Sequence, residues 1–284
     1  CTGRFSILNS LENRVYDIEL ETGGQIIAKF YRPGRWSLDA LEDEHDFLFE
    51  LRDAGVPVGA PMTLADGFSV GTLEGEAAGI HYALFPRIRG RTLDEPNPDN
   101  LETLGRLIAR IHEVGSLGDA SNRPTLDVQS YGWDNLAILL DDDLVHPTAR
   151  DLYANVVESL LVLIEPRFRD VGLQRIHGDC HLGNLIWNQG PHFIDFDDLV
   201  IGPAIQDLWM LAPSRDVVGV ERRRHLARGY AGVGDFDIAW LDLVEPLRAL
   251  RMIRYATWIA RRSDDPYFQR TFPDFGSAAW WHHE

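Results

Sequence analysis

The first third of the chain consists of short apolar segments separated by turn residues, as in a region of antiparallel strands. The segments are rich in β-branched and aromatic side chains, and Gly23 and Gly24 separate the second from the third as in a hairpin turn. The predicted strands cover residues 4–8, 15–20, 25–31, 67–72 and 81–85. This pattern predicts a small β-rich region at the start of the chain.

One helix is predicted between these strands, over residues 38–54. Ser37 can cap its first turn, and Gly55 and Pro57 follow its end. The residues that recur at helical spacing and mark its apolar face are Leu41, Leu48 and Leu51. Glu44 also lies on that apolar face, where a charged side chain is not expected.

Residues 86–100 contain Pro, Gly, Asp and Asn at the density of a linker. After this segment the apolar positions recur at the helical period. The predicted helices cover residues 101–115, 152–164, 222–230 and 245–262. A short hairpin of residues 185–187 and 192–194 interrupts them. We therefore predict an α+β protein with a small β-rich N-lobe, residues 1–86, and a larger, mostly helical C-lobe, residues 87–284.

The segment LQRIHGDCHLGNLIWNQGPHFIDFDD, residues 173–198, contains an unusual density of polar side chains. Asp179 follows a predicted helix, Asn184 comes five positions later, and Asp195 ends the next hairpin strand. Phosphoryl transfer needs this set of groups. One carboxylate orients or accepts the proton of an attacking hydroxyl, while an amide oxygen and a second carboxylate hold Mg²⁺ on the phosphates.

The motif HGDCHLGN resembles the catalytic loop of kinases in its aminoglycoside phosphotransferase variant, and FIDFDD resembles the metal-binding motif of that superfamily. Over its whole length the chain resembles the bacterial stress response serine/threonine kinases. The resemblance rests on the segments LNSLENRVY, KFYRPGRW, LEDEH, HGDCHLGN, GPAIQDLWML and EPLRALRMIRY. The resemblance implies a bilobal protein kinase-like fold and ATP- and Mg²⁺-dependent phosphorylation of protein Ser or Thr, including autophosphorylation. It also implies that the native chain continues beyond residue 284.

The resemblance assigns roles to further residues. Asp179 is expected to be the catalytic base, and Asn184 and Asp195 are expected to bind the metal. Lys29 would bind the ATP phosphates and Glu44 would position it, because an ion pair between them also explains a carboxylate on an apolar helix face. Segment 9–13, NSLEN, lacks the glycines of a kinase phosphate loop, so backbone amides and the Ser10 hydroxyl would cover the phosphates.

Composition limits the partners. The chain has 284 residues, 45% of them hydrophobic, and a formal net charge of -17, which argues against nucleic acid or an anionic membrane as the main target. Cys1 and Cys180 are its two cysteines, so a disulfide framework is not expected. No uncharged segment is long enough to span a bilayer. We expect a monomer in the cytoplasm.

Several polar residues of the central segment have alternative interpretations. His177 can be a hydrogen-bonded histidine that buttresses the loop or a catalytic base. Asp197 and Asp198 can be solvated turn acids or can modulate the metal. Asp207 can be a carboxylate favoured by the N-terminus of its helix, whereas the resemblance implies that it braces the catalytic loop.

Three alternative functions use the same residues. The first is a kinase of a small hydroxylated molecule, such as an aminoglycoside, choline or homoserine, for which an acidic cleft suits a cationic substrate. The second is a nucleotide-binding scaffold without transfer activity. The third is a metal-dependent hydrolase built on His177, Asp179 and His181, with Cys180 as a further possible ligand.

Overall fold

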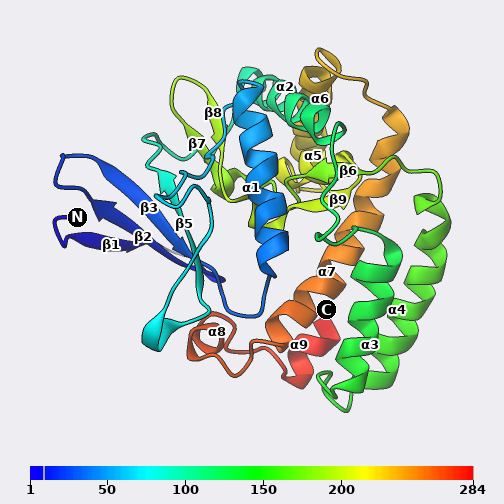
Figure 1. Ribbon diagram of the computed structural model, residues 1–284. Coiled ribbons are helices and arrows are strands. Elements are labelled where there is room, and N and C mark those ends of the chain that lie inside the picture. Colours follow the sequence, from blue (N-terminus) through cyan, green and yellow to red (C-terminus); the bar gives the residue numbers. More distant parts are fainter. Residues whose placement is uncertain (9, 284) are drawn as a thin grey trace. The chain divides into compact units, whose positions relative to one another are not determined.

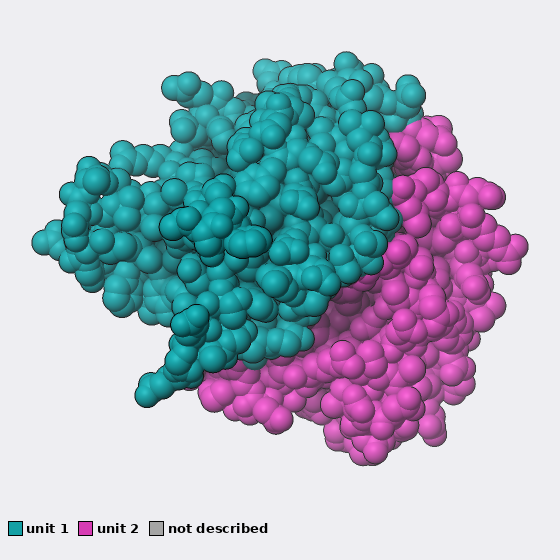
Figure 2. All heavy atoms as spheres, in the orientation of Figure 1, with its two compact units in different colours: residues 1–123, 174–236 teal, residues 124–173, 237–284 magenta. Residues whose placement is uncertain are grey.

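The computed structural model describes residues 1–8 and 10–283, which form two compact units. The first unit comprises residues 1–123 and 174–236, and the second comprises residues 124–173 and 237–284 (Figure 2). Every residue of the predicted site belongs to the first unit. Within the described residues, no helix is both long and apolar enough to cross a membrane.

An antiparallel sheet opens the first unit, with its strands in the order β1-β2-β3-β5-β4. Figure 1 labels β1, β2, β3 and β5 of this sheet. The strands are β1 (Phe5–Leu8), β2 (Arg14–Glu19), β3 (Gln25–Phe30), β4 (Gly71–Thr72) and β5 (His81–Pro86). The predicted strands are confirmed, but β4 is shorter than the predicted segment 67–72. Its extension along β5 is limited because the Met62 amide donates to the Leu84 carbonyl at 2.7 Å and so occupies the next position on that strand.

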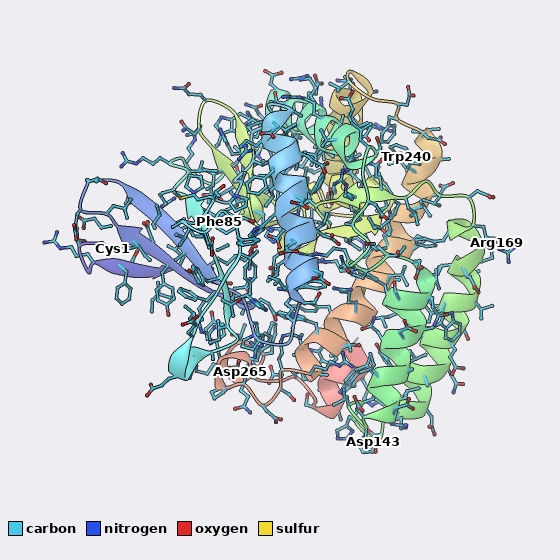
Figure 3. All side chains as sticks on the ribbon, viewed as in Figure 1. Cys1, Phe85, Asp143, Arg169, Trp240 and Asp265 are labelled. Atoms are coloured by element: carbon cyan, nitrogen blue, oxygen red, sulfur yellow. The ribbon has the colours of Figure 1, made fainter. Side chains whose placement is uncertain are left out.

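Helix α1 (Leu38–Asp53) confirms the predicted helix and its cap, since the Ser37 hydroxyl accepts a hydrogen bond from the Ala40 amide at 3.2 Å. Its apolar face packs against the sheet, in a buried cluster that includes Leu41, Val70 and Ala83. Phe85 of β5, labelled in Figure 3, also packs against this cluster. Lys29 lies opposite Ala83 in the register of β3 and β5, so packing against α1 fixes the strand that carries the lysine.

The remaining elements of the first unit surround the predicted catalytic loop. They are α2 (Pro98–Gly115), β6 (Gln174–Ile176), β7 (Leu185–Trp187), β8 (Pro191–Phe193), β9 (Val200–Gly202), α5 (Ile205–Leu211) and α6 (Val217–Ala231). Strands β7 and β8 form the predicted hairpin, and β6 pairs with β9. Helices α2 and α6 cross closely at Gly105, where a Cβ atom would lie 2.1 Å from the Leu226 carbonyl oxygen.

The second unit is helical. It contains α3 (Asp134–Asp141), α4 (Arg150–Ile164), α7 (Val244–Ala260), α8 (Pro266–Thr271) and α9 (Ala278–His283). The predicted helices at 152–164 and 245–262 are confirmed by α4 and α7. The fold class therefore agrees with the prediction of a β-sheet region followed by a mostly helical region.

Candidate active site

Lys29 is the centre of a buried charged cluster. Its Nζ atom lies 2.8 Å from Asp195 Oδ1, 3.2 Å from Asp197 Oδ1 and 3.9 Å from Glu44 Oε1. Burial disfavours the charged form of Lys29, but these three carboxylates outweigh burial and raise its pKa well above the ordinary value. Lys29 is therefore held as a cation. The expected ion pair with Glu44 is present, although Asp195 is the nearer partner.

Glu44 has a second cationic partner, Arg123. One guanidinium nitrogen of Arg123 donates to Glu44 Oε2 at 2.9 Å, and the other two donate to the carbonyl oxygens of Ala40 at 2.7 Å and Asp197 at 2.8 Å. The guanidinium also lies 4.3 Å from the ring centroid of Trp36. Arg123 thus connects helix α1 to the backbone of the segment that follows Asp195.

The sequence reasoning missed Arg123. It lies in the loop after α2, 79 positions from Glu44, and no local pattern distinguishes it from a solvated arginine. Only the cost of burying Glu44 gave an indirect signal, because a buried carboxylate needs compensation and Lys29 is shared among three of them. Contacts across such a separation are decided by the packing of α1.

Asp207 braces the backbone of the catalytic loop. Its two carboxylate oxygens accept hydrogen bonds from the amides of His177 at 2.8 Å and Gly178 at 2.9 Å, and one of them also contacts His112 Nε2 at 3.1 Å. The side chain is fully buried. Asp207 therefore has the bracing arrangement implied by the resemblance, rather than acting only as a helix-end carboxylate.

His177 buttresses the loop through its ring. His177 Nε2 hydrogen-bonds with the Ile194 carbonyl at 3.0 Å, and the ring centroid lies 4.4 Å from that of Phe196. The residue is fully buried. Gly178 has a φ of +83°, and a Cβ atom there would lie 2.1 Å from the Asp198 carbonyl oxygen, so glycine is needed at this turn. These contacts favour the buttressing interpretation of His177 over a catalytic one.

A hydrogen bond from the Asn184 side chain to the Asp179 backbone connects the two residues. The Asn184 side-chain amide donates to the Asp179 carbonyl oxygen at 3.0 Å, and the Ile194 amide donates to the Asn184 carbonyl oxygen at 3.0 Å. The second bond places Asn184 beside the strand end that delivers Asp195. The Asp179 carboxylate is 23% exposed and lies 3.4 Å from His181 Nε2, so a hydroxyl substrate can approach it from solvent.

Asp195 has an unusual backbone conformation. Its φ and ψ are both 63°, in the left-handed region that residues other than glycine seldom adopt. The conformation ends β8 and turns the chain into the 3₁₀ turn Phe196–Asp198, while the Asp195 side chain remains 47% exposed. Strain of this kind is typical of functional sites, and here it directs a carboxylate towards Lys29.

Asp197 is buried, and Asp198, although partly exposed, is ion-paired. Arg35 forms ion pairs with both, at 2.8 Å to Asp198, and Asn13 Nδ2 donates to Asp197 Oδ2 at 3.1 Å. Burial acts to raise the pKa of Asp197, but Lys29, Arg35 and the Asn13 hydrogen bond lower it to about 2. The solvated interpretation was therefore wrong for Asp197, because tertiary packing buries it among cations.

Ser10 helps to form the turn between β1 and β2. Its hydroxyl accepts a hydrogen bond from the Asn13 amide at 3.2 Å, and Asn13 Oδ1 accepts one from the Arg32 amide at 3.1 Å. Asn9, the first residue of the predicted phosphate loop, lies outside the described residues. These hydrogen bonds give Ser10 a role in the turn, and its contact with phosphate stays a prediction.

The side chains of Asn184 and Asp195 suit a magnesium ion. Because the Asn184 amide nitrogen donates to Asp179, its Oδ1 is the atom that can bind a cation. An amide oxygen and one carboxylate are hard ligands, and Mg²⁺ commonly takes few protein ligands and completes its shell with water and phosphate oxygens. Among the described residues, His, Cys, Asp and Glu side chains form no group of three or more that could hold a metal.

Cys180 is not placed to act as a metal ligand. The thiol is fully buried, and burial, followed by the charges of Asp207 and Asp179, raises its pKa well above the ordinary value. Among the described residues, Cys180 belongs to no group of three or more His, Cys, Asp and Glu side chains that could hold a metal. The geometry therefore does not support a zinc site on Cys180, His181 and Asp179.

His45, next to Glu44 on α1, makes protein stability sensitive to acid. Its ring bridges the Tyr31 hydroxyl at 2.9 Å and the Ser69 hydroxyl at 2.7 Å. Burial, with the positive charges of Lys29 and Arg123, lowers the pKa of His45 to about 3. Below its ordinary pKa of about 6.5, the unfolded chain binds a proton that the folded protein excludes, so the free energy of unfolding falls as the pH falls.

Replacing His45 by glutamine is expected to remove this acid sensitivity. The glutamine side chain can still hydrogen-bond with Tyr31 and Ser69 but does not titrate. Between pH 7 and 4.5 the free energy of unfolding of the wild type should fall by about 2.5 kcal/mol more than that of the variant. Urea denaturation over this range measures the difference, with the exposed His282→Gln as a control. Parallel profiles for wild type and His45→Gln would contradict the prediction.

The fold and the site define a class of enzyme. A charged strand lysine, a braced Asp-to-Asn loop and a following aspartate are the parts required for phosphoryl transfer. The chain belongs to the phosphotransferase enzyme family, whose model matches residues 5–244. The predicted reaction class, a phosphotransferase, is confirmed.

Particular relatives are similar over nearly the whole chain. Stress response kinase A of Salmonella paratyphi A and the serine/threonine protein kinase RdoA of Salmonella typhimurium are each 38% identical over 275 residues, covering 96% of this chain and 82% of the relative. A solved structure of the amicoumacin kinase hAmiN in complex with AMP-PNP, Ca²⁺ and Ami superposes with a TM-score of 0.77 at 21% identity, covering 97% of this chain and 87% of that one. The predicted kinase-like fold is thereby confirmed.

Proposed function

We propose that this protein is an ATP- and Mg²⁺-dependent kinase of protein serine or threonine side chains that also phosphorylates itself. The observation that carries the proposal is the arrangement of Asp179, Asn184, Asp195 and Lys29 within one compact unit. The name of the relative RdoA, a serine/threonine protein kinase, supports a protein acceptor. The names of the other relatives support a role in the bacterial stress response, which we place in the cytoplasm and assign to a monomer.

In this proposal each residue has a separate task. Asp179 accepts the proton of the attacking hydroxyl. The hydrogen bond from the Asn184 side chain to the Asp179 carbonyl oxygen holds the backbone at that position. Lys29 binds the ATP phosphates, and Glu44 orients Lys29 with help from Arg123. Residues 1–86 act as the nucleotide-binding lobe, in which Ser10 covers the phosphates. Residues 87–284 supply the catalytic loop and the metal ligands.

Asn184 and Asp195 would hold Mg²⁺. The ion, when bound, supplies positive charge that stabilises the phosphate oxygens during transfer. Lys29 contacts Asp195 at 2.8 Å, which fixes the orientation of that carboxylate before the nucleotide enters. Preorganised groups of this kind need little rearrangement during the reaction.

A second candidate is a kinase of a small cationic alcohol. The formal net charge of -17 favours attraction of a cation, and the structurally similar amicoumacin kinase was solved with a small molecule. Both functions need the same Asp179, Asn184 and Asp195, so the acceptor must be identified by product analysis.

The test is incubation of the purified protein with γ-labelled ATP and Mg²⁺, with or without a generic basic protein. We expect label on serine or threonine of the protein, as shown by phosphoamino acid analysis, and its loss with EDTA or with Asp195→Asn. Parallel reactions contain an aminoglycoside, choline or homoserine. Label that enters only one of these compounds would replace the proposed function by the second candidate.

A further inference from the structure

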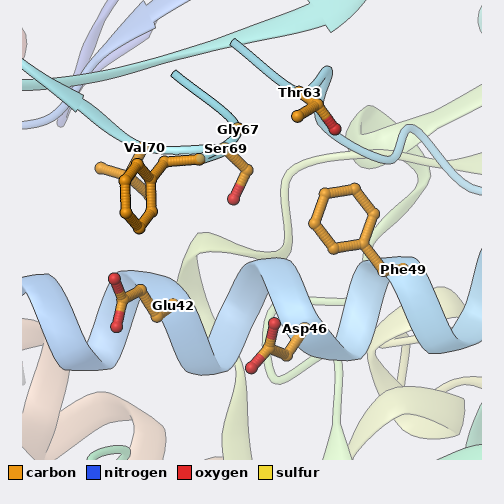
Figure 4. Close-up of a pocket in the computed structure, with 8 residues that line it drawn as sticks. Glu42, Asp46, Phe49, Thr63, Gly67, Ser69 and Val70 are labelled. Atoms are coloured by element: carbon orange, nitrogen blue, oxygen red, sulfur yellow. The ribbon is translucent and has the colours of Figure 1, made fainter. Parts of the chain in front are cut away.

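A cavity outside the active site lies between helix α1 and the segment that leads to β4 (Figure 4). It has a volume of about 220 Å³, far more than one water molecule needs. Glu42, Asp46 and Phe49 line it from α1. The residues that line it from the opposite segment are Thr63, Gly67, Phe68, Ser69 and Val70.

The walls of this cavity have the chemistry of a site for an organic cation. Two aromatic rings, Phe49 and Phe68, stand with two carboxylates, Glu42 and Asp46. Phe68 is 62% exposed, and so large an exposed ring beside a cavity is available to a ligand. The Phe49 ring already contacts one cation of the protein, since the Arg52 guanidinium lies 4.7 Å from its centroid. Aromatic faces attract guanidinium and ammonium groups.

The carboxylates of the cavity are not neutralised by ion pairs among the described residues. No such pair includes Glu42 or Asp46 within 4 Å, although many other acidic residues of this unit are paired. Burial and the neighbouring charges of Glu50 and Asp43 raise the pKa of Asp46, while Arg175 acts in the opposite direction. Arg175 is itself paired with Glu50, and Arg52 with Asp53, so negative charge remains in excess at the cavity and would be relieved by a bound cation.

Hydrogen bonds to the buried His45 hold part of the opposite wall of the cavity. Ser69 Oγ is 2.7 Å from Nδ1 of the fully buried His45, whose Nε2 is 2.9 Å from the Tyr31 hydroxyl. Val70, beside Ser69, belongs to the buried cluster between α1 and the sheet. A wall held in this way keeps its shape without a ligand, which lowers the entropic cost of binding.

We propose that this cavity is a docking site for an arginine or lysine side chain of a protein substrate. The occupant follows from charge complementarity, because two carboxylates and two aromatic rings line the cavity together. The cavity contains none of the residues assigned to phosphoryl transfer. Docking on α1 would increase the local concentration of a basic protein near the active site without changing the chemical step. This substrate role rests on the proposed protein kinase function, whereas binding of the cation does not.

Binding is tested first, with a fluorescently labelled tetra-arginine peptide and its citrulline counterpart, which has the same shape without the charge. The variant Glu42→Gln/Asp46→Asn is compared with Glu74→Gln/Glu76→Gln, an exposed pair outside the cavity with the same change in net charge. Fluorescence anisotropy should show about tenfold weaker binding for the first variant and less than about twofold for the second. Phe68→Leu should weaken arginine binding by about threefold.

Transfer is then measured with a generic basic protein. Glu42→Gln/Asp46→Asn should raise the KM for that protein by about tenfold and leave kcat and the KM for ATP unchanged. If no variant transfers phosphate but the binding differences hold, the proposed function fails and the cation site stands. Equal weakening by both double variants, or equal binding of the arginine and citrulline peptides, would show only non-specific attraction and would overturn the docking site.

Discussion

Replacing Asp179 by alanine is expected to lower kcat by about three to four orders of magnitude. The substitution removes the group that we propose accepts the proton of the attacking hydroxyl. It keeps the carbonyl oxygen of residue 179, which accepts the hydrogen bond from Asn184. It also leaves the brace from Asp207 to His177 and Gly178 intact. The loop should therefore keep its shape while losing its base.

Steady-state transfer assays and thermal unfolding of the same samples check this result. The KM for ATP should change little, because Asp179 is assigned to the hydroxyl acceptor and not to the nucleotide. Asp179→Asn, which keeps the shape of the side chain without a base, should show a loss of similar size. Turnover close to that of the wild type in either variant would remove Asp179 from the mechanism.

Replacing Arg123 by methionine is expected to lower the free energy of unfolding by about 3–5 kcal/mol. The change leaves the Glu44 carboxylate buried with only the shared charge of Lys29, and removes the donors to the carbonyl oxygens of Ala40 and Asp197. Because Arg123 also holds the segment after Asp195, kcat should fall as well. Removing the cation of a buried ion pair lowers stability by more than the pair contributes, because the remaining carboxylate is left buried without a partner.

A double-mutant cycle with Glu44→Gln separates the ion pair from the other contacts. The double variant should be less destabilised than the sum of the single variants, because no unpaired charge remains beside the missing guanidinium. Urea denaturation measures each variant, and Arg224→Met, which removes an exposed arginine paired with Glu221, should cost less than about 0.5 kcal/mol. Additive effects in the cycle, or equal effects of Arg123→Met and Arg224→Met, would contradict the proposed role of Arg123.

Arg35 and Arg123 illustrate a general property of this site. Five carboxylates, from Glu12, Glu44, Asp195, Asp197 and Asp198, lie among cationic side chains. These cations also connect α1 and the β1–β2 turn to the segment of residues 195–198. Each charge is stabilised by the others, so removal of one member is felt by the rest. The low pKa of Asp197, about 2, reflects this mutual stabilisation.

The sequence alone determined most of the local elements, and it predicted the groups that we propose take part in the reaction. Local patterns predicted the leucine spacing of α1, the cap at Ser37 and the hairpin of β7 and β8, because each depends on residues only a few positions apart. Asp179, Asn184 and Asp195 could also be proposed from the sequence, because phosphoryl transfer restricts the residue types and the spacing within one short segment. The sequence also distinguished Glu44, because it is a charged residue on the apolar face of a helix.

The tertiary structure decided which distant residues support these groups. Arg123 reaches Glu44 across 79 positions, and Arg35 reaches Asp198 across 163. Arginine and aspartate are usually solvated, so composition and periodicity give no sign that these will be buried. Their partners are set by the packing of α1, α5 and the strands. Because an unpaired charge is costly to bury, burial favours the arrangement in which these charges are paired.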